Sequence, residues 1–298
     1  MPIPILATKY NIQHKEQSMI KAEIVADSVN PEGVRITTME LTYPRFVHSE
    51  VMTHRMFSRN AASSRAIPAK TLRKMVWNSP AVPIHWGQNQ GGMQAKAELQ
   101  GFKLKAAKVV WNLGAKLACI VNKSMEMAKV HKQICNRVLE PFQDIKTIVT
   151  ATEYDNFFWL RDHEDAQPEI WELAKAMKIA RDASKPESVH WGQWHLPYAN
   201  GTETMSLKDR IAVSISCCAQ ISYRKNDTSL EKAHRIADSL TSGSRTHASP
   251  FEHQAKAQKY VNKNGHKLNG LPTGFTHKDK DDVWSGNFKN WVQNRNLM

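Results

Sequence analysis

The segment from Thr53 to Arg65 places the strongest constraint on how this chain folds. It follows a stretch from Arg35 to Tyr43 that alternates imperfectly between apolar and polar residues, is rich in β-favouring types and stops at Pro44, which predicts a strand. Apolar residues then recur at helical spacing between residues 46 and 52. This pattern places His54 and the residue after it near the C-terminal end of a short helix, with residues 58–65 in the loop beyond it.

The same segment has the composition of an anion-binding site. Its thirteen positions include three arginines, one histidine, one asparagine and three serines. Guanidinium forks and short hydroxyls match phosphate oxygens, and a helix that begins or ends inside the segment adds backbone N–H donors. Composition alone also allows a solvated basic face.

Charge and cysteine usage narrow the class of protein. The chain has 298 residues with 41 basic and 28 acidic side chains, a net charge of +13 that suits a nucleotide, a dinucleotide, a polyglutamylated folate or a nucleic acid. The four cysteines form neither a C-x-x-C pair nor a secreted disulfide framework, which indicates a reducing cytoplasm. We find no export leader and no apolar run long enough to span a bilayer, and we expect no metal site.

Apolar periodicity predicts mainly helices along the rest of the chain. Residues 79–93 and 184–205 are rich in loop-forming residues. Ser206 begins a predicted capping box, and a further helix is predicted from Ser229. The remaining predictions are a long helix over Ala95–Arg137, a strand over Ile145–Ala151 and helices over Tyr154–Arg161 and Pro168–Ala183.

The anion-binding segment resembles the signature of the flavin-dependent thymidylate synthases, R-H-R-x-x-S-x-N-E-x-S-x-R-Y. Three positions depart from this pattern, with Thr53 in place of the first arginine, Ala61 in place of glutamate and Ala66 in place of tyrosine. The residues that match are His54, Arg55, Ser58, Asn60, Ser63 and Arg65.

Further segments resemble other motifs of the same family, and together the matches cover about half of the chain. Residues 248–253 resemble the flavin-contacting S/T-P-F-E-H loop, and residues 218–223 resemble the C-A-R-V-S-Y that precedes it. Residues 136–141, 156–161 and 166–170 resemble the nucleotide-binding arginine, the N-x-x-x-x-R helix and its continuation. The S-P-F-E-H loop follows the signature here and precedes it in most members, so the order is phage-like and circularly permuted. Permutation is tolerated where the original termini lie close together at the surface.

The resemblance implies an α/β (α+β) fold with a central sheet and long helices in one domain over residues 1–298. The signature block would cover about 22–180 and the permuted flavin-loop block about 206–298. Arg161 would be the catalytic residue, since a guanidinium against the pyrimidine stabilises negative charge on the ring. The implied substrate contacts are Glu50, Ser63, Arg65, Arg137 and Arg161, and the implied flavin contacts are His54, Arg55, Asn156, Ser222, Ser249 and Glu252.

The reaction implied by the resemblance is methylation of dUMP to dTMP, with FAD as cofactor and NADPH and methylenetetrahydrofolate as co-substrates. Family members build each site from several subunits, so a homotetramer is expected, and no cysteine should be catalytic. Ala61, and Glu50 where the family has glutamine, leave open a related pyrimidine methylase or hydroxymethylase that serves modified DNA. A basic nucleic-acid-binding protein that uses the arginines as a phosphate clamp is a third reading.

Overall fold

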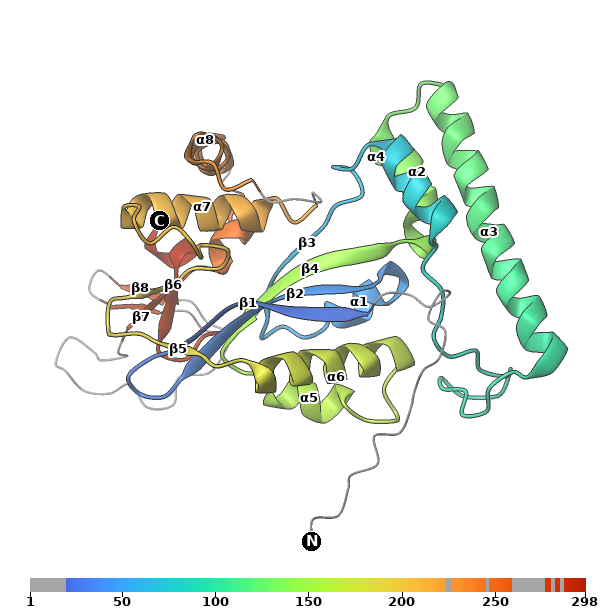
Figure 1. The fold of residues 1–298 in the computed structure, drawn as a ribbon, viewed down its shortest axis with the longest axis horizontal. Helices are drawn as coiled ribbons and strands as arrows, with labels where there is room; N and C mark the ends of the chain where they lie inside the picture. The colour runs from blue at the N-terminus through green and yellow to red at the C-terminus, as the bar shows by residue number, and fades with distance from the viewer. Residues whose placement is uncertain (1–19, 223–226, 245–246, 259–276, 280–281, 285–286) are drawn as a thin grey trace, which may run out of the picture.

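The computed structural model describes residues 20–222, 227–244, 247–258, 277–279, 282–284 and 287–298, and the chain is a mixed α/β protein (Figure 1). The strands are β1 (Lys21–Val29), β2 (Arg35–Pro44), β3 (Ser58–Ala61), β4 (Asp144–Ala151), β5 (Glu187–Ser188), β6 (Trp194–His195), β7 (Ala255–Ala257), β8 (His277–Asp279), β9 (Asp282–Trp284) and β10 (Trp291–Gln293). The α-helices are α1 (His48–Val51), α2 (Ala69–Asn78), α3 (Gly101–Met127), α4 (Lys132–Cys135), α5 (Asp155–Arg161), α6 (Pro168–Ala183), α7 (Leu207–Ala219) and α8 (Leu230–Thr241). The 3-10 helices are η1 (Arg45–Val47), η2 (Asn136–Phe142), η3 (Ser249–Glu252) and η4 (Asn294–Leu297).

A five-stranded sheet in the order β3-β4-β2-β1-β5 forms the centre of the molecule. Its neighbouring strands pair antiparallel, except that β1 and β5 are parallel. The β1–β2 hairpin turns at Gly33, whose φ of 77° is open to glycine without steric cost. The side-chain oxygen of Asn30 stabilises this turn by accepting the backbone N–H groups of Glu32 and Val34, each at 3.0 Å.

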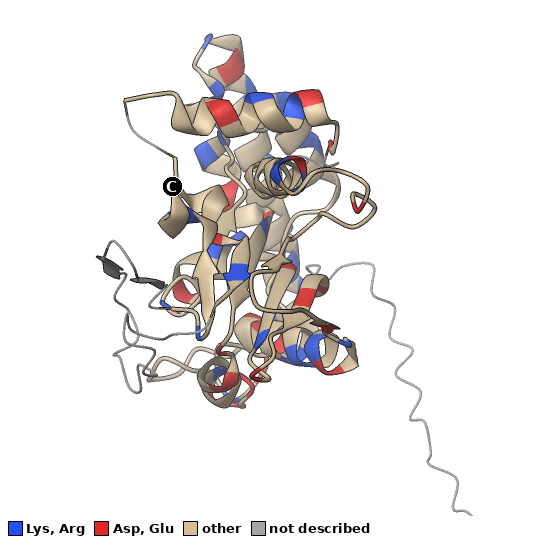
Figure 2. Cartoon of the chain, turned by 90° about the vertical axis from the view of Figure 1, so that its left-hand side faces the viewer, with Lys and Arg blue, Asp and Glu red and all other residues tan. Residues whose placement is uncertain are grey.

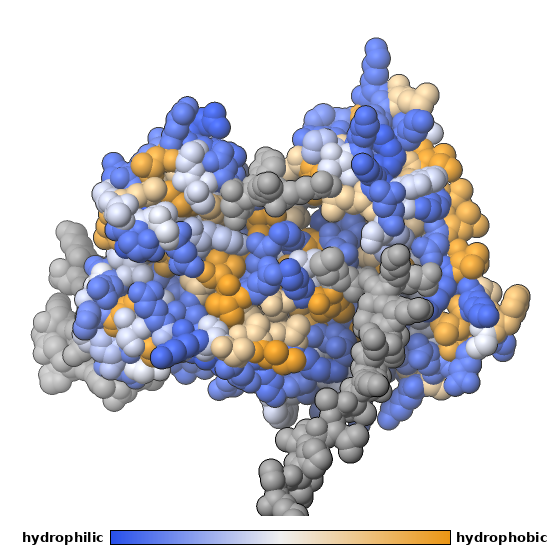
Figure 3. Space-filling view, viewed as in Figure 1, coloured by the Kyte–Doolittle hydropathy of each residue, from blue (hydrophilic) through white to orange (hydrophobic). Residues whose placement is uncertain are grey.

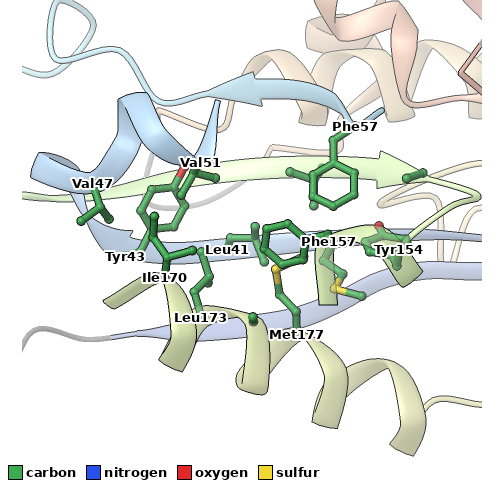
Figure 4. Close-up of a cluster of buried hydrophobic side chains, with 14 of the residues drawn as sticks. Leu41, Tyr43, Val47, Val51, Phe57, Tyr154, Phe157, Ile170, Leu173 and Met177 are labelled. Carbon is green, nitrogen blue, oxygen red and sulfur yellow. The ribbon is translucent and has the colours of Figure 1, made fainter. Parts of the chain in front are cut away.

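One face of the sheet is apolar and is covered by α5 and α6 (Figures 1 and 4). Successive side chains of a strand point to opposite faces, so Met39, Leu41 and Tyr43 of β2 share this face. They pack with apolar residues of both helices into a continuous buried cluster. The labelled members in Figure 4 are Leu41, Tyr43, Val47, Val51, Phe57, Tyr154, Phe157, Ile170, Leu173 and Met177.

The opposite face of the sheet is more polar, and we call it the polar face; the buried side chains of Ile36 and Ile148 also lie on it. It carries Thr38, Glu40 and Thr42 of β2, together with Lys146 and Thr150 of β4, which lie across from them. Helix α7, η3 and a small sheet in the order β10-β7-β6 lie against this face (Figure 1). Buried polar groups are stable only where they find hydrogen-bond partners, so this face needs the specific contacts described below.

The strand that follows His253, β7, lies close to β2. Ala255 and Ala257 of β7 pack with Ile36 of β2 and with Trp291 in one buried cluster. A permuted order predicts that the strand after His253 pairs with or packs near the strand at residues 35–43, and this packing confirms that prediction.

Helices α2 and α3 stand at one end of the sheet (Figure 1), where Leu72 and Val76 of α2 pack on Ala115 and Cys119 of α3. The outer side of α3 is apolar and exposed, as the right-hand edge of Figure 3 shows. None of the helices in the described residues combines the length and apolar character that crossing a membrane requires. The exposed apolar residues of α3 are Phe102, Val109, Val110, Leu113, Leu117, Ile120, Val121 and Met127.

The elements with the strongest sequence patterns are confirmed. The predicted strands appear as β2 and β4, and the predicted helices after them appear as α5 and α6. Ser206 caps α7, with its hydroxyl accepting the N–H of Asp209 at 3.2 Å.

Two predictions about element boundaries are wrong. The predicted helix over Ala95–Arg137 is shorter, because residues 97–99 bond to residues 86–88 and Lys129 adopts a φ of 61° that ends the helical path. Residues 58–65 were expected to be a loop, but Ser58–Ala61 form the edge strand β3. Pairing with β4 overrides the loop-like composition of this stretch.

Candidate functional site

The signature runs from the turn after α1, along β3, into the loop that precedes α2. Its first part brings together two of the predicted site residues. Arg161, at the end of α5, donates from Nε to Nε2 of His54 at 3.0 Å. The imidazole also packs edge-on against Phe157, with ring centroids 4.7 Å apart. His54 therefore contacts Arg161 directly, although the sequence assigned them to different ligands.

His54 is held as a neutral imidazole. Burial, together with the positive charges of Arg161 and Arg59, lowers its pKa to about 4. Because Nε2 accepts the hydrogen bond from Arg161, the ring proton of the neutral form lies on Nδ1. The Nη donors of Arg161 form no hydrogen bond with the residues that the structure describes, so they can face a ligand.

The middle of the signature is tied to the segment at the end of α7. Asn60 donates from Nδ2 to the backbone oxygen of Cys218 at 2.8 Å, and the N–H of Ser63 donates to Oγ of Ser222 at 2.9 Å. These bonds join residues more than 150 positions apart in sequence. The structure thus places Ser63 and Ser222, predicted to bind substrate and flavin, against each other; Tyr223, the last residue of this motif, lies outside the described residues.

The S-P-F-E-H segment also reaches the signature strand. Gln293 donates from Nε2 to Oγ of Ser58 at 2.5 Å and to the backbone oxygen of Glu252 at 3.1 Å. The carboxylate of Glu252 pairs with Arg295. Gln293 therefore joins Glu252 to Ser58, the first residue of β3, which follows His54 by four residues in sequence.

A carboxylate that the sequence analysis missed organises the loop after β3. Glu140 accepts hydrogen bonds from Oγ of Ser64 at 2.7 Å and from Arg137 at 2.9 Å, and Arg45 reaches it at 3.0 Å. Arg45 also donates to the backbone oxygen of Ala62 at 3.3 Å. Arg137, predicted to contact the nucleotide, is thus one of two guanidinium groups held beside the signature by a shared carboxylate.

Two further arginines of the signature are available to an anion. The side chains of Arg55 and Arg65 are exposed, and within the described part of the chain neither forms an ion pair or a hydrogen bond. Exposed guanidinium groups next to backbone and hydroxyl donors suit phosphate oxygens.

A cleft of about 320 Å³ opens on the polar face beside these groups. Figure 3 shows the surface notched between the α7–α8 side and the α2–α3 side, and the lining residues come from both sides and from the sheet between them. The cleft is mostly apolar, with a few polar groups, a composition typical of small-molecule sites. Its lining residues are Thr42, Ala62, Ile67, Pro68, Thr71, Met75, Asp144, Ile145, Lys146, Ile221 and Ser222.

The predicted residues do not all meet in one chain. Glu50, Asn156 and Ser249 are exposed, and no side-chain bond within the described ranges links them to the others. The His54–Arg161 pair lies before β3, while Ser63 lies after it. A strand rises about 3.3 Å per residue, so the four residues of β3 separate the two groups by roughly 10 Å or more.

A buried polar chain, also missed by the sequence analysis, anchors the S-P-F-E-H segment to the sheet. His253 bonds through Nδ1 to Thr150 at 2.9 Å, Thr150 bonds to Thr38 at 2.7 Å, Thr38 bonds to Nε2 of His195 at 2.7 Å, and His195 bonds through Nδ1 to Ser28 at 2.9 Å. Burial lowers the pKa of His195 to about 3, and burial together with the neighbouring His195 lowers the pKa of His253 to about 3. Both rings are therefore neutral at physiological pH.

Comparison with known proteins finds solved structures that are similar to part of this chain, among them two structures of one methylase. No family model and no curated protein matches the sequence. The UMP/dUMP methylase PolB from Streptomyces cacaoi bound with 5-Br dUMP is 16% identical over 55% of this chain and 91% of that chain, with a TM-score of 0.45. The same methylase bound with 5-Br UMP is 18% identical over 55% of this chain and 89% of that chain, also with a TM-score of 0.45. These comparisons assign the chain to no family.

Proposed function

We propose that this protein is a flavin-dependent thymidylate synthase of permuted order, which methylates dUMP with methylenetetrahydrofolate and uses FAD and NADPH. One observation carries this proposal. The three segments that resemble the family's motifs are far apart in sequence, yet they meet along β3 through the pairs Asn60–Cys218 and Ser63–Ser222 and through the side chain of Gln293. Motifs that form one binding site are expected to meet in the fold, and these three segments do.

The residues present fit a flavin dinucleotide and a nucleotide. Arg55 and Arg65 are exposed, and no ion pair within the described ranges involves either, so both can bind phosphate. Ser222 and Glu252 would hold the flavin from the polar-face side, and Ser63 would hold the nucleotide. When bound, the flavin supplies the hydride that completes the methyl group.

Arg161 provides the electrostatic part of the chemistry. Its guanidinium, directed by the neutral ring of His54, stabilises negative charge that develops on the pyrimidine and so makes carbon 5 of the base nucleophilic. A neutral His54 accepts a hydrogen bond from Arg161, whereas a protonated ring would repel it. The guanidinium of Arg161 and the neutral state of His54 both support activation of the base by polarisation, without an enzyme nucleophile.

The protein would act as a homotetramer. The exposed apolar row on α3 supports assembly, since apolar patches of this kind mark protein–protein contacts. The separation of the His54–Arg161 pair from Ser63 supports sites completed by a neighbouring subunit. By contrast, acidic residues are interspersed with basic ones on the side seen in Figure 2, which disfavours a continuous nucleic-acid surface on that side.

Product analysis tests the proposal. Purified protein is incubated with FAD, NADPH, methylenetetrahydrofolate and dUMP, and the nucleotide is identified by mass spectrometry. The expected product carries one added methyl group, and reactions that lack folate should yield none. A hydroxymethyl product would replace the proposed reaction with the related one, and a protein that binds no flavin and forms no product would refute it.

A further inference from the structure

Lys146 is the feature of the cleft that the proposed function has not used. Among the described lining residues it is the one cation, and Asp144 is the one anion. Lys146 lies on β4, and its backbone oxygen accepts the N–H of Ala62 at 2.8 Å. The backbone oxygen of Ala62 accepts in turn from Arg45, so Lys146 and the arginines near Glu140 lie on either side of one residue of the signature loop.

The ammonium group of Lys146 is fixed in place by two residues. It pairs with Glu40, which lies on the neighbouring strand β2 and is largely buried. The second carboxylate oxygen of Glu40 accepts the hydroxyl of Tyr198 at 2.7 Å. Tyr198 adopts a φ of 61°, a conformation that costs a non-glycine residue on the order of 1 kcal/mol. The fold thus retains a strained residue whose hydroxyl holds Glu40.

This arrangement leaves Lys146 with free donors that face the cleft. An ammonium group has three N–H donors and no acceptor, and Glu40 uses one of them. The side chain is 42% exposed. The remaining polar side chains of the lining, apart from Asp144, are the hydroxyls of Thr42, Thr71 and Ser222, which can donate or accept and so do not distinguish a carbonyl from an amino group.

We propose that Lys146, positioned by Glu40 and Tyr198, reads the base of the nucleotide and selects uracil over cytosine. This inference rests on the proposed function, because it takes the cleft as the site of the pyrimidine, with Arg161 supplied by a neighbouring subunit. Uracil presents a carbonyl oxygen at ring position 4, which accepts from the ammonium group. Cytosine presents an amino group there, and two donors facing each other leave both unpaired, at a cost that the mostly apolar cleft increases.

The test measures nucleotide binding by calorimetry on the full chain, without folate or turnover. Wild-type protein should bind dUMP more tightly than dCMP. Lys146→Met keeps the length of the stem and removes the donors, so affinity for dUMP should fall about tenfold to a hundredfold while affinity for dCMP changes little. Tyr198→Phe should weaken the preference partly, and Lys175→Met, on the surface of α6, should leave it intact.

Two outcomes would overturn the inference. If Lys146→Met weakens both nucleotides equally, Lys146 binds a group common to both, such as phosphate. If wild-type protein binds both equally, the cleft does not read position 4 of the base. Should Lys146→Met fail to fold, Lys146→Arg keeps the charge and the pairing with Glu40 but displaces the donors, and it must lower the preference for dUMP. If the wild-type protein prefers dUMP to dCMP but forms no methylated product, the proposed function is refuted and the inference about Lys146 is not.

Discussion

Mild acid should destabilise this protein through the two histidines buried between the sheet and the S-P-F-E-H segment. His195 and His253 are fully buried, and their pKa is about 3 in the folded chain, against about 6.5 in the unfolded chain. Below pH 6.5 the unfolded chain binds protons that the folded chain cannot. The stabilising contribution is therefore complete above pH 6.5 and is lost as the pH falls from 6.5 towards 3.

The magnitude follows from the size of the lowered pKa. Each pH unit below 6.5 costs such a histidine about 1.36 kcal/mol, so at pH 5 the loss is about 2 kcal/mol for each ring. About 4 kcal/mol is an upper bound for the pair, since part of the lowered pKa of His253 comes from His195. A loss of this size is a large fraction of the 5–15 kcal/mol by which domains are typically stable.

Urea denaturation at pH 7 and pH 5 measures this loss as a fall in the free energy of unfolding. His253→Asn keeps a polar atom near Thr150 and removes one titrating ring, so it should reduce the loss between pH 7 and pH 5 by up to about 2 kcal/mol. His190→Gln alters an exposed ring and should leave the dependence unchanged. Wild-type curves that coincide at the two pH values, or a His253→Asn variant that keeps the full acid loss, would contradict the reasoning.

Three further predictions concern the site. Arg161→Ala should lower turnover by about a hundredfold, with a smaller loss of flavin occupancy, and should raise the pKa of His54 in an NMR titration; equal losses of turnover and flavin would make Arg161 a cofactor-binding or folding residue. Burial raises the pKa of Cys217 to about 11 and that of Cys218 well above its ordinary value, so both should resist alkylation at pH 7, and Cys217→Ala should keep turnover in a folded, flavin-binding protein. Asn60→Ala leaves the carbonyl of Cys218 without its partner and should lower the free energy of unfolding by about 1–3 kcal/mol in urea melts; an unchanged midpoint would mean that this bond does not stabilise the fold.

Local patterns in the sequence were sufficient for some elements of this fold. The helix from Pro168 to Ala183 was predicted at both ends, because Pro168 fits the first turn and the apolar residues keep one period. The strand β3 was missed because Ser58–Ala61 contains no apolar alternation, and its conformation comes from pairing with β4. Such a strand is visible only once its partner is in place.

The candidate site was likewise predictable from the sequence only in part. Motif resemblance identified Ser63 and Ser222 as site residues, and the structure places them in contact. Glu140 lies in the segment 136–141, but no role was predicted for it, and His195 and Lys146 belong to no motif used here. Each of the three is bonded to a residue far from it in sequence. The sequence pattern contains no signal for such contacts, because they depend on which strands become neighbours.

The unequal faces of the central sheet also bear on how this chain folds during synthesis. The helices that cover the apolar face end at residue 183, shortly after β4. The polar face is completed by contacts such as Ser58–Gln293, which join residues 235 positions apart in sequence. At about 5–20 residues per second, the ribosome needs about five to twenty seconds to go from residue 183 to Gln293. During this interval the uncovered face shows mainly hydroxyl and charged side chains, which water solvates well, with Ile36 and Ile148 among them. The sheet of a half-made chain therefore exposes less apolar surface than an uncovered apolar face would, and the candidate site is among the last parts to form.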